Sequence, residues 1–403
     1  MVQSYHKNGN GRKYEVEYTI HDLILYALGI GCGSLPSCPE DNKEERKFIY
    51  ENEPNGFEAF PTFLLALGFR AVPMGQNNDH VPNIVKSSRM PAFPPPSIRD
   101  VYSILFDIEG KEAPVNIKVG RALHISEKYR FYHHAIPIPS NNSQQCQIVL
   151  HSDILSVTTR SIGTFVTTET HYYHRSDQSK KDGMILLATS QTKMLWMGLV
   201  PKTLDKTRTY SDKIYQMINV KEKLDKKSAP ITSQSGTGHG IKKRIKSKNL
   251  YNEISTLQIP KNQALLYRLS GDTNNIHVIG LGKDENETMP PILHGLCTLA
   301  IITRQILLKH TNNRAKTTLR SIECTFTKPV FVDDKLLIET YLHSHNIVNH
   351  TLFIQFRAFT VKAKVKTAPP MPNNDMERKL VVDRGMIELE SKYFNDHRYK
   401  SKL

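Results

Sequence analysis

Two helix-like blocks of apolar residues lie near the beginning of the chain. Apolar residues recur at helical spacing over residues 23–30, which predicts a helix there. Thr19 precedes this block and Asp22 follows Thr19 three residues later, a weak variant of the capping box that begins many helices. A second apolar block, residues 60–69, predicts a buried helix. Pro61 lies near the first turn of this helix, a position where proline is favoured.

From about residue 121 to residue 199 the helical pattern gives way to short runs that are rich in β-branched and aromatic residues. Pro, Ser and Gly separate these runs, as expected for strands joined by turns. Helices followed by several strands without further helices favour an α+β fold with an antiparallel sheet over a doubly wound parallel sheet. The runs are residues 148–150, 154–157, 164–173 and 194–200.

The same order of elements begins again in the second half. Pro291 precedes the clearest helical pattern of the chain, residues 292–309, which is apolar on most faces. Strand-like runs follow at residues 319–326, 336–343 and 351–365. The order and the lengths predict a repeat, a helix and then strands that could wrap it, although residue identities do not repeat.

These patterns divide the chain into four segments. Residues 14–200 and 251–366 are predicted to form the two halves of the fold. Residues 201–250 are polar and basic and are interpreted as a linker or loop. Residues 367–403 begin with a proline-rich stretch and continue with many charges, so we expect a tail outside the core.

The net charge of +15 is concentrated in one of these segments. Residues 201–250 contain 13 Lys and Arg but only 4 Asp and Glu, so they carry nine of the net positive charges. A block of this kind is typical of a solvated linker, and it does not indicate a folded face for nucleic acid. Its most basic run, residues 242–248, could still contact nucleic acid, an anionic lipid surface or a phosphorylated ligand.

The composition also excludes some classes of protein. The longest nearly continuous apolar stretch, residues 23–33, is shorter than the ~18 residues that span a bilayer, so we expect no membrane span. The first 18 residues lack the apolar core of a signal peptide. Five cysteines without a CxxC pair indicate neither a disulfide framework nor a structural zinc site, which fits a reducing compartment.

The densest polar cluster in an apolar setting is residues 267–277. Asp272 and His277 are too far apart in sequence to be neighbours on one helical face, but a turn begun by Gly271 can bring them together. A carboxylate and an imidazole in one small volume could hold a water molecule, one group accepting its proton and the other supplying or positioning one. Asn274 could be a third hydrogen-bonding contact. A purely structural Gly-Asp turn is the alternative interpretation.

A second candidate feature lies where the long helix of the second half begins. Gly295 presents an N–H without an intrahelical partner and without a side chain in front of it. A carbonyl oxygen can dock there, and the helix dipole favours the negative charge that develops on it. Tight packing at the helix entry explains the glycine equally well.

Both features match one known signature. The hydratase 2 signature reads Y-R-L-S-G-D-x-N-x-x-H and is followed by P-I-L-H-G-L-C-T, and residues 267–277 and 291–298 follow it at a matching interval. The chain therefore resembles the enoyl-CoA hydratase 2 family of MaoC-like dehydratases, which includes the hydratase unit of the peroxisomal multifunctional enzyme. The resemblance extends over about residues 16–365. It implies a double hot-dog fold, with two halves that each have a long central helix wrapped by an antiparallel sheet.

The resemblance implies hydration of a trans-2-enoyl-CoA to a (3R)-3-hydroxyacyl-CoA in peroxisomal fatty-acid β-oxidation. Asp272 and His277 would hold and activate the added water, and Asn274 would help to orient it. The N–H of Gly295 would polarise the thioester carbonyl, and His294 would join it in binding the acyl-CoA substrate. Neither a metal nor a redox cofactor is needed for this chemistry.

Glu51 matches the acidic residue of the F-x-Y-E motif in the first half of the family, so the resemblance implies that activity needs it. The chain departs from the family pattern at Thr273, at Asn275 and over residues 279–288, which are unusually polar. Two alternatives remain open, and the polar stretch supports the second of them. One is a hot-dog thioesterase that acts on acyl-CoA, and the other is a non-catalytic acyl-CoA-binding copy of the fold.

The last three residues, Ser401, Lys402 and Leu403, match the tripeptide that the peroxisomal import receptor recognises. We therefore expect the protein in the peroxisomal matrix. The protein could also assemble as a homodimer.

Overall fold

The computed structural model describes the chain in segments. These are residues 12–33, 41–73, 122–133, 135–140, 145–175, 183–197, 253–282, 288–311, 317–346, 348–363 and 376–391. The predicted basic linker, residues 201–250, and the terminal tripeptide, residues 401–403, lie outside the described residues.

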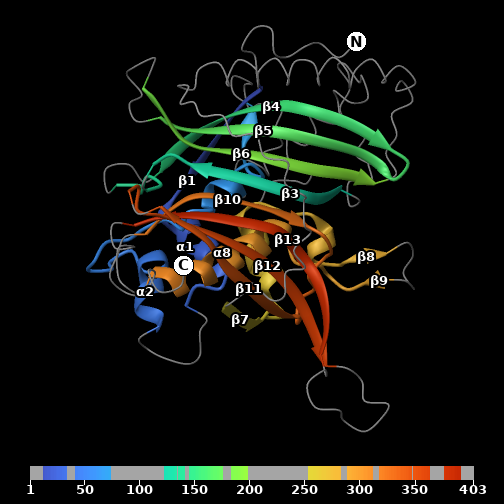
Figure 1. Ribbon diagram of the computed structural model, residues 1–403. Coiled ribbons are helices and arrows are strands. Elements are labelled where there is room, and N and C mark those ends of the chain that lie inside the picture. The colour runs from blue at the N-terminus through green and yellow to red at the C-terminus, as the bar shows by residue number, and fades with distance from the viewer. Residues whose placement is uncertain are drawn as a thin grey trace, which may run out of the picture.

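About half of the described residues belong to one antiparallel sheet of eleven strands, in the order β2-β1-β4-β5-β6-β3-β10-β13-β12-β11-β7. In Figure 1 the green strands of the first half continue through β3 into the orange and red strands of the second half. In the first half these are β1 (Arg12–Tyr18), β2 (Val72–Pro73), β3 (Ala122–Phe131), β4 (Cys146–Arg160), β5 (Gly163–Arg175) and β6 (Met184–Met197). In the second half they are β7 (Glu253–Gln258), β10 (Thr318–Phe326), β11 (Lys335–Asn346), β12 (Thr351–Ala363) and β13 (Met376–Glu390). A separate two-stranded sheet pairs β8 (Leu281–Gly282) with β9 (Thr288–Met289).

The two halves meet where β3 pairs with β10. Their register runs from Ser321 opposite Arg130 to Thr325 opposite Ser126. Strands far apart in sequence thus become neighbours at the middle of the sheet, and the predicted antiparallel strands of both halves are confirmed.

The helices differ in length between the halves. The first half has α1 (Ile20–Gly29), α2 (Asp41–Ile49) and α3 (Phe63–Leu67), whereas the second half has α7 (Gln263–Tyr267) and α8 (Gly295–Thr311). The predicted capping box of α1 is present, since the side chains of Thr19 and Asp22 each bond to the other residue's N–H. Gly31 and Gly33, both with positive φ, follow the end of α1. The expectation of a long central helix in each half is therefore corrected, because α8 has 17 residues and α1 only ten.

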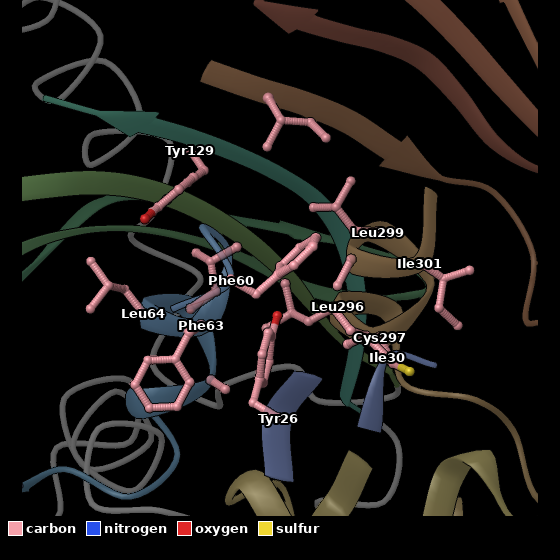
Figure 2. Close-up of a cluster of buried hydrophobic side chains, with 14 of the residues drawn as sticks. Tyr26, Ile30, Phe60, Phe63, Leu64, Tyr129, Leu296, Cys297, Leu299 and Ile301 are labelled. Carbon is pink, nitrogen blue, oxygen red and sulfur yellow. The ribbon is translucent and has the colours of Figure 1, made fainter. Parts of the chain in front are cut away.

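The helices fill the inside of the curved sheet. Figure 2 shows Tyr26 and Ile30, from α1 and its end, near Leu296 and Cys297 of α8. The ring of Tyr26 lies 5.5 Å from that of Phe63, between the centroids, and its hydroxyl is 2.8 Å from the Thr62 hydroxyl. All these side chains are buried, so the first half packs directly on the central helix of the second half.

The sheet also contains residues that were expected outside the core. β13 lies between β10 and β12, and Val381, Val382, Ile387 and Leu389 are fully buried there. The prediction of a tail over residues 367–403 is therefore wrong for residues 376–390, and the second half extends beyond residue 366. The charges of β13 misled the prediction, because in a half-buried strand alternate side chains face solvent.

No helix in the described segments is long and apolar enough to cross a membrane.

Candidate active site

The turn that carries the candidate residues is fixed by helices on both sides. α7 leads into a 3-10 turn, Arg268–Ser270, and Gly271 then adopts a φ of 136°. A Cβ at Gly271 would also lie 2.6 Å from Cγ of Arg70. This backbone suits glycine alone, and it turns the chain towards Asp272.

Asp272 and Asn274 form the turn that follows. The N–H of Asn274 donates to Oδ1 of Asp272 at 3.2 Å, and the N–H of Ile276 donates to Oδ1 of Asn274 at 3.3 Å. Asn274 thereby caps a second 3-10 turn, Asn275–His277. The local hydrogen bonds explain why this sequence leaves helical geometry here.

His277 ends this turn and faces Asp272. Its Nδ1–H donates to the carbonyl of Ile292 at 2.8 Å, which leaves the lone pair on Nε2 in the neutral ring. Nε2 lies 3.8 Å from Oδ2 of Asp272. The predicted convergence of the carboxylate and the imidazole is therefore present, at a separation that one bridging water can span.

His294 lies on the other side of His277. The two rings are stacked, with centroids 3.5 Å apart, and His294 also contacts the ring of Tyr267. Nε2–H of His294 donates to the backbone carbonyl of Asp272 at 3.3 Å. His294 thus holds the ring of His277 and the backbone of Asp272 in place.

Burial shifts the pKa values of this cluster in opposite directions. Desolvation raises the pKa of Asp272, although the nearby His277 and the N–H of Asn274 oppose the rise. Desolvation lowers the pKa of His277, and it lowers that of His294 strongly. A carboxyl group whose pKa is raised, beside neutral imidazoles, is suited to accepting and returning a proton.

Gly295 is the first residue of α8, so its N–H has no acceptor within the helix. A methyl group at this position would lie 3.4 Å from Cβ of His124 and 3.6 Å from the ring of Phe326. Gly295, His124 and Phe326 all line the same cavity as Asp272.

This cavity has a volume of about 490 Å³. Asp272, Asn274, His277, His294 and Gly295 line one part of it, and β5 and β6 of the first half line another. The strands contribute Val166, Thr168, Thr170, Met194 and Trp196. The site thus lies between the halves, and five of the six predicted residues surround it.

Glu51 is the exception. It lies in the turn after α2, its side chain is exposed, and it is not among the residues that line the cavity. The structure does not bring Glu51 to the other candidate residues, because the chain after α2 runs along the surface.

The sequence did not reveal two residues of β3 that line the cavity, His124 and Glu127. Nε2 of His124 lies 3.1 Å from Oε2 of Glu127. An H-x-x-E spacing in a strand run was the available signal, but in a regular strand residues three apart face opposite sides.

The cluster also contains donor atoms that metals bind. One donor atom each from Asp272, His277 and His294 lies within 4.8 Å of the others. A carboxylate and two neutral imidazoles are ordinary ligands of a divalent transition metal. Addition of water can also use the same groups for proton transfer, without an ion.

Comparison with known families identifies the second half. Residues 223–357, which include the site turn and α8, match the family described as MaoC like domain. This part of the chain is thus similar to a MaoC-like domain. Residues 16–90 match a second family, the MFE-2 hydratase 2 N-terminal domain, ahead of the MaoC-like domain.

Individual relatives agree with these matches. The chain is 23% identical over 334 residues to the peroxisomal multifunctional enzyme type 2 of Mus musculus, an alignment that covers 83% of this chain and 34% of that protein. Over a stretch of 89 residues the chain is 36% identical to the peroxisomal enoyl-CoA hydratase 2 of Arabidopsis thaliana, covering 22% of this chain and 28% of that protein. The chain thus spans about a third of the multifunctional enzyme.

Solved structures share the fold. A MaoC-like dehydratase from Phytophthora capsici superposes with a TM-score of 0.55 and 18% identity, covering 94% of this chain and 95% of that one. Full-length peroxisomal multifunctional enzyme type 2 from Drosophila melanogaster gives a TM-score of 0.51 and 17% identity, covering 94% of this chain and 48% of that one. The sheet and its helices are therefore arranged as in MaoC-like dehydratases.

Proposed function

We propose that the protein is a hydro-lyase that hydrates trans-2-enoyl-CoA to (3R)-3-hydroxyacyl-CoA. The observation that carries this proposal is the pair of Asp272 and His277, 3.8 Å apart on a cavity that Gly295 also lines. Addition of water to an enoyl thioester needs a base near C3 and a hydrogen-bond donor at the carbonyl oxygen. In this proposal Asp272 would be the base and the N–H of Gly295 the donor.

In the proposed reaction one water lies between Asp272 and His277. The carboxylate of Asp272 accepts a proton from the water while the water oxygen bonds to C3. The electron pair of the C2–C3 double bond moves towards the thioester oxygen, where the N–H of Gly295 stabilises the negative charge. The proton then passes from Asp272 to C2, which restores the carboxylate and completes the addition of one water.

His277 positions the water in this scheme. Because Nδ1–H is bonded to the carbonyl of Ile292, Nε2 can accept a hydrogen bond from the second hydrogen of the water. The lowered pKa of His277 supports this part, since only the neutral ring has an acceptor nitrogen. Asn274, buried on the same cavity, would hold the substrate or the water from one side.

The test is to mix the purified chain with a short and a long trans-2-enoyl-CoA. We expect the absorbance of the enoyl thioester to fall and the product to have the R configuration at C3. Asp272→Asn is the matched control, because it keeps the shape of the side chain and removes the base. An S product, or undiminished turnover in Asp272→Asn, would contradict the proposed mechanism.

The same mixtures distinguish the alternatives. Release of free CoA, detected with a thiol-reactive dye, would indicate a thioesterase. Binding of the ligand without any change in absorbance would indicate a non-catalytic acyl-CoA-binding protein.

We further propose that this reaction serves fatty-acid β-oxidation in the peroxisome. Relatives named as peroxisomal hydratases and the terminal Ser401, Lys402 and Leu403 support this location. A fluorescent protein fused before Met1 should enter peroxisomes. Removal of the last three residues should leave the fusion in the cytosol.

A further inference from the structure

A second pair of imidazole and carboxylate lines the cavity, separate from Asp272 and His277. It consists of His124 and Glu127 of β3, so it comes from the other half of the molecule. Nε2–H of His124 is shared between Oε2 of Glu127, at 3.1 Å, and the carbonyl of Ser126, at 3.2 Å.

An irregularity of the strand makes this pair possible. Between β3 and β6 the register shifts, so that His124 lies opposite Met194 while Ser126 already lies opposite Lys193. Ile125 is thus an extra residue in β3, a bulge. Two residues three apart face opposite sides of a regular strand, but a bulge between them brings them to the same side.

The pair has an inner and an outer member. The side chain of Glu127 is only 1% exposed, and the Thr192 hydroxyl donates to its Oε2 at 2.8 Å. The side chain of His124 is 14% exposed and lies nearer the open cavity. Burial raises the pKa of Glu127, and its contacts with His124 and Thr192 oppose the rise. Glu127 is therefore the buried hydrogen-bond partner of His124 and holds its ring in place.

His124 lies next to the beginning of α8. Its ring is 4.8 Å from the ring of Phe326, and its Cβ is 3.4 Å from where a methyl on Gly295 would stand. The imidazole and the free N–H of Gly295 thus border one part of the cavity, whereas Asp272 and His277 border another.

We propose that His124, positioned by Glu127, donates a second hydrogen bond to the thioester oxygen beside the N–H of Gly295. This inference rests on the proposed hydratase function. An enolate oxygen has more than one lone pair, so a single amide leaves part of its charge without a donor. Nε2 of His124 is already bonded to Glu127 and to the carbonyl of Ser126, so Nδ1–H is the ring donor proposed to reach the thioester oxygen. His124 transfers no proton to carbon.

The test measures the thioester carbonyl directly. A saturated acyl-CoA with an isotope-labelled carbonyl binds without being hydrated, and infrared difference spectroscopy reads how strongly the carbonyl is polarised. We expect a smaller lowering of its stretching frequency in His124→Leu than in the wild type. His124→Gln, which keeps an N–H donor, should recover part of the difference. His133→Leu is the control, since His133 is exposed in a turn outside the cavity.

Turnover of trans-2-enoyl-CoA gives the second measurement. His124→Leu should lower kcat by about 100-fold, the usual effect of losing one oxyanion donor, with far less change in KM. Glu127→Gln should lower kcat less, because the amide oxygen can still accept from Nε2–H and keep the ring in place, although more weakly than the carboxyl group does. A merely structural role of Glu127 would instead lower stability and leave kcat of the folded protein unchanged.

An unchanged carbonyl frequency in folded His124→Leu would overturn the inference, even if the wild type hydrates enoyl-CoA. A wild type that binds and polarises the saturated thioester but hydrates nothing would overturn the proposed function and leave the role of His124 supported.

Discussion

Replacing Gly295 by Ala should leave the stability of the fold intact and remove most of the activity. The added methyl group would have its nearest neighbours at 3.4 Å, Cβ of His124, and at 3.6 Å, the ring of Phe326. These are ordinary van der Waals distances, and Gly295 opens a helix rather than a positive-φ turn. Replacing a glycine by alanine, where alanine can adopt the same backbone conformation, typically stabilises the folded protein by about 0.4–1 kcal/mol. We therefore expect urea denaturation to show equal or slightly higher stability.

Hydration should nevertheless be almost lost in this variant. The methyl projects into the cavity between His124 and Phe326, where it keeps the thioester oxygen from the N–H of Gly295. Loss of such a donor lowers kcat by about 10²–10³-fold. The assay is the fall in enoyl-thioester absorbance, with circular dichroism to confirm the fold. A folded Gly295→Ala protein with wild-type turnover would refute the placement of the carbonyl at this amide.

Three further changes test the site and its supports. Asp272→Asn should lower kcat/KM by about 10²–10⁴-fold, the range of general acid–base catalysis. Because burial raises the pKa of Asp272, wild-type activity should fall on acidification at a higher pH than an exposed aspartate would give. Arg304→Met leaves the buried Glu45 without its partner, so it should cost about 3–5 kcal/mol in denaturation, whereas the double variant with Glu45→Leu should recover most of that loss. Gly29→Ala places a methyl 3.2 Å from Cα of Tyr267, so it should destabilise the fold by about 1–3 kcal/mol and lower turnover through the shifted turn.

For each of these variants, one result would contradict the expected outcome. The raised pKa means that ionised Asp272 destabilises the native state, so Asp272→Asn should gain stability over the wild type as the pH rises through that pKa. No gain at neutral pH, and no difference between neutral and acidic pH, would mean that the carboxyl is well solvated. If Arg304→Met and the double variant with Glu45→Leu lose the same amount of stability, side-chain packing and not the ion pair determines the stability at this position. Full activity in Gly29→Ala would show that the turn does not depend on the contact with Tyr267.

Local sequence predicted the turn and the helices α1, α3 and α8, but not α2 or α7, because neighbouring residues decide the former. Gly271 supplies the positive φ, and the side chains of Asp272 and Asn274 bond to N–H groups two residues later. The helix predicted over residues 292–309 appears as Gly295–Thr311. It begins later than predicted, because Ile292 pairs with Phe331 in a β-bridge.

The contacts that depend on distant strands could not be read in this way. The pair of Arg304 and Glu45 joins residues 259 apart in sequence. His124 and Glu127 share a face only because of the bulge at Ile125, which the pairing of β3 with β6 creates. A strand with charges on its exposed side, such as β13, looks like a polar tail until its neighbours are known.

The place of β13 in the sheet has a consequence for synthesis in the cell. Among the residues that the structure describes, β13 is the last strand in sequence, yet it lies between β10 and β12. While the ribosome is still translating, β10 and β12 each expose an unpaired edge, which is the kind of surface that aggregates. A nascent chain that stalls before residue 376 already contains the turn of Asp272 and His277 but lacks the strand that joins β10 to β12. Such a product should be a target for chaperones and proteases, because it exposes the edges of β10 and β12 although it already contains the candidate site.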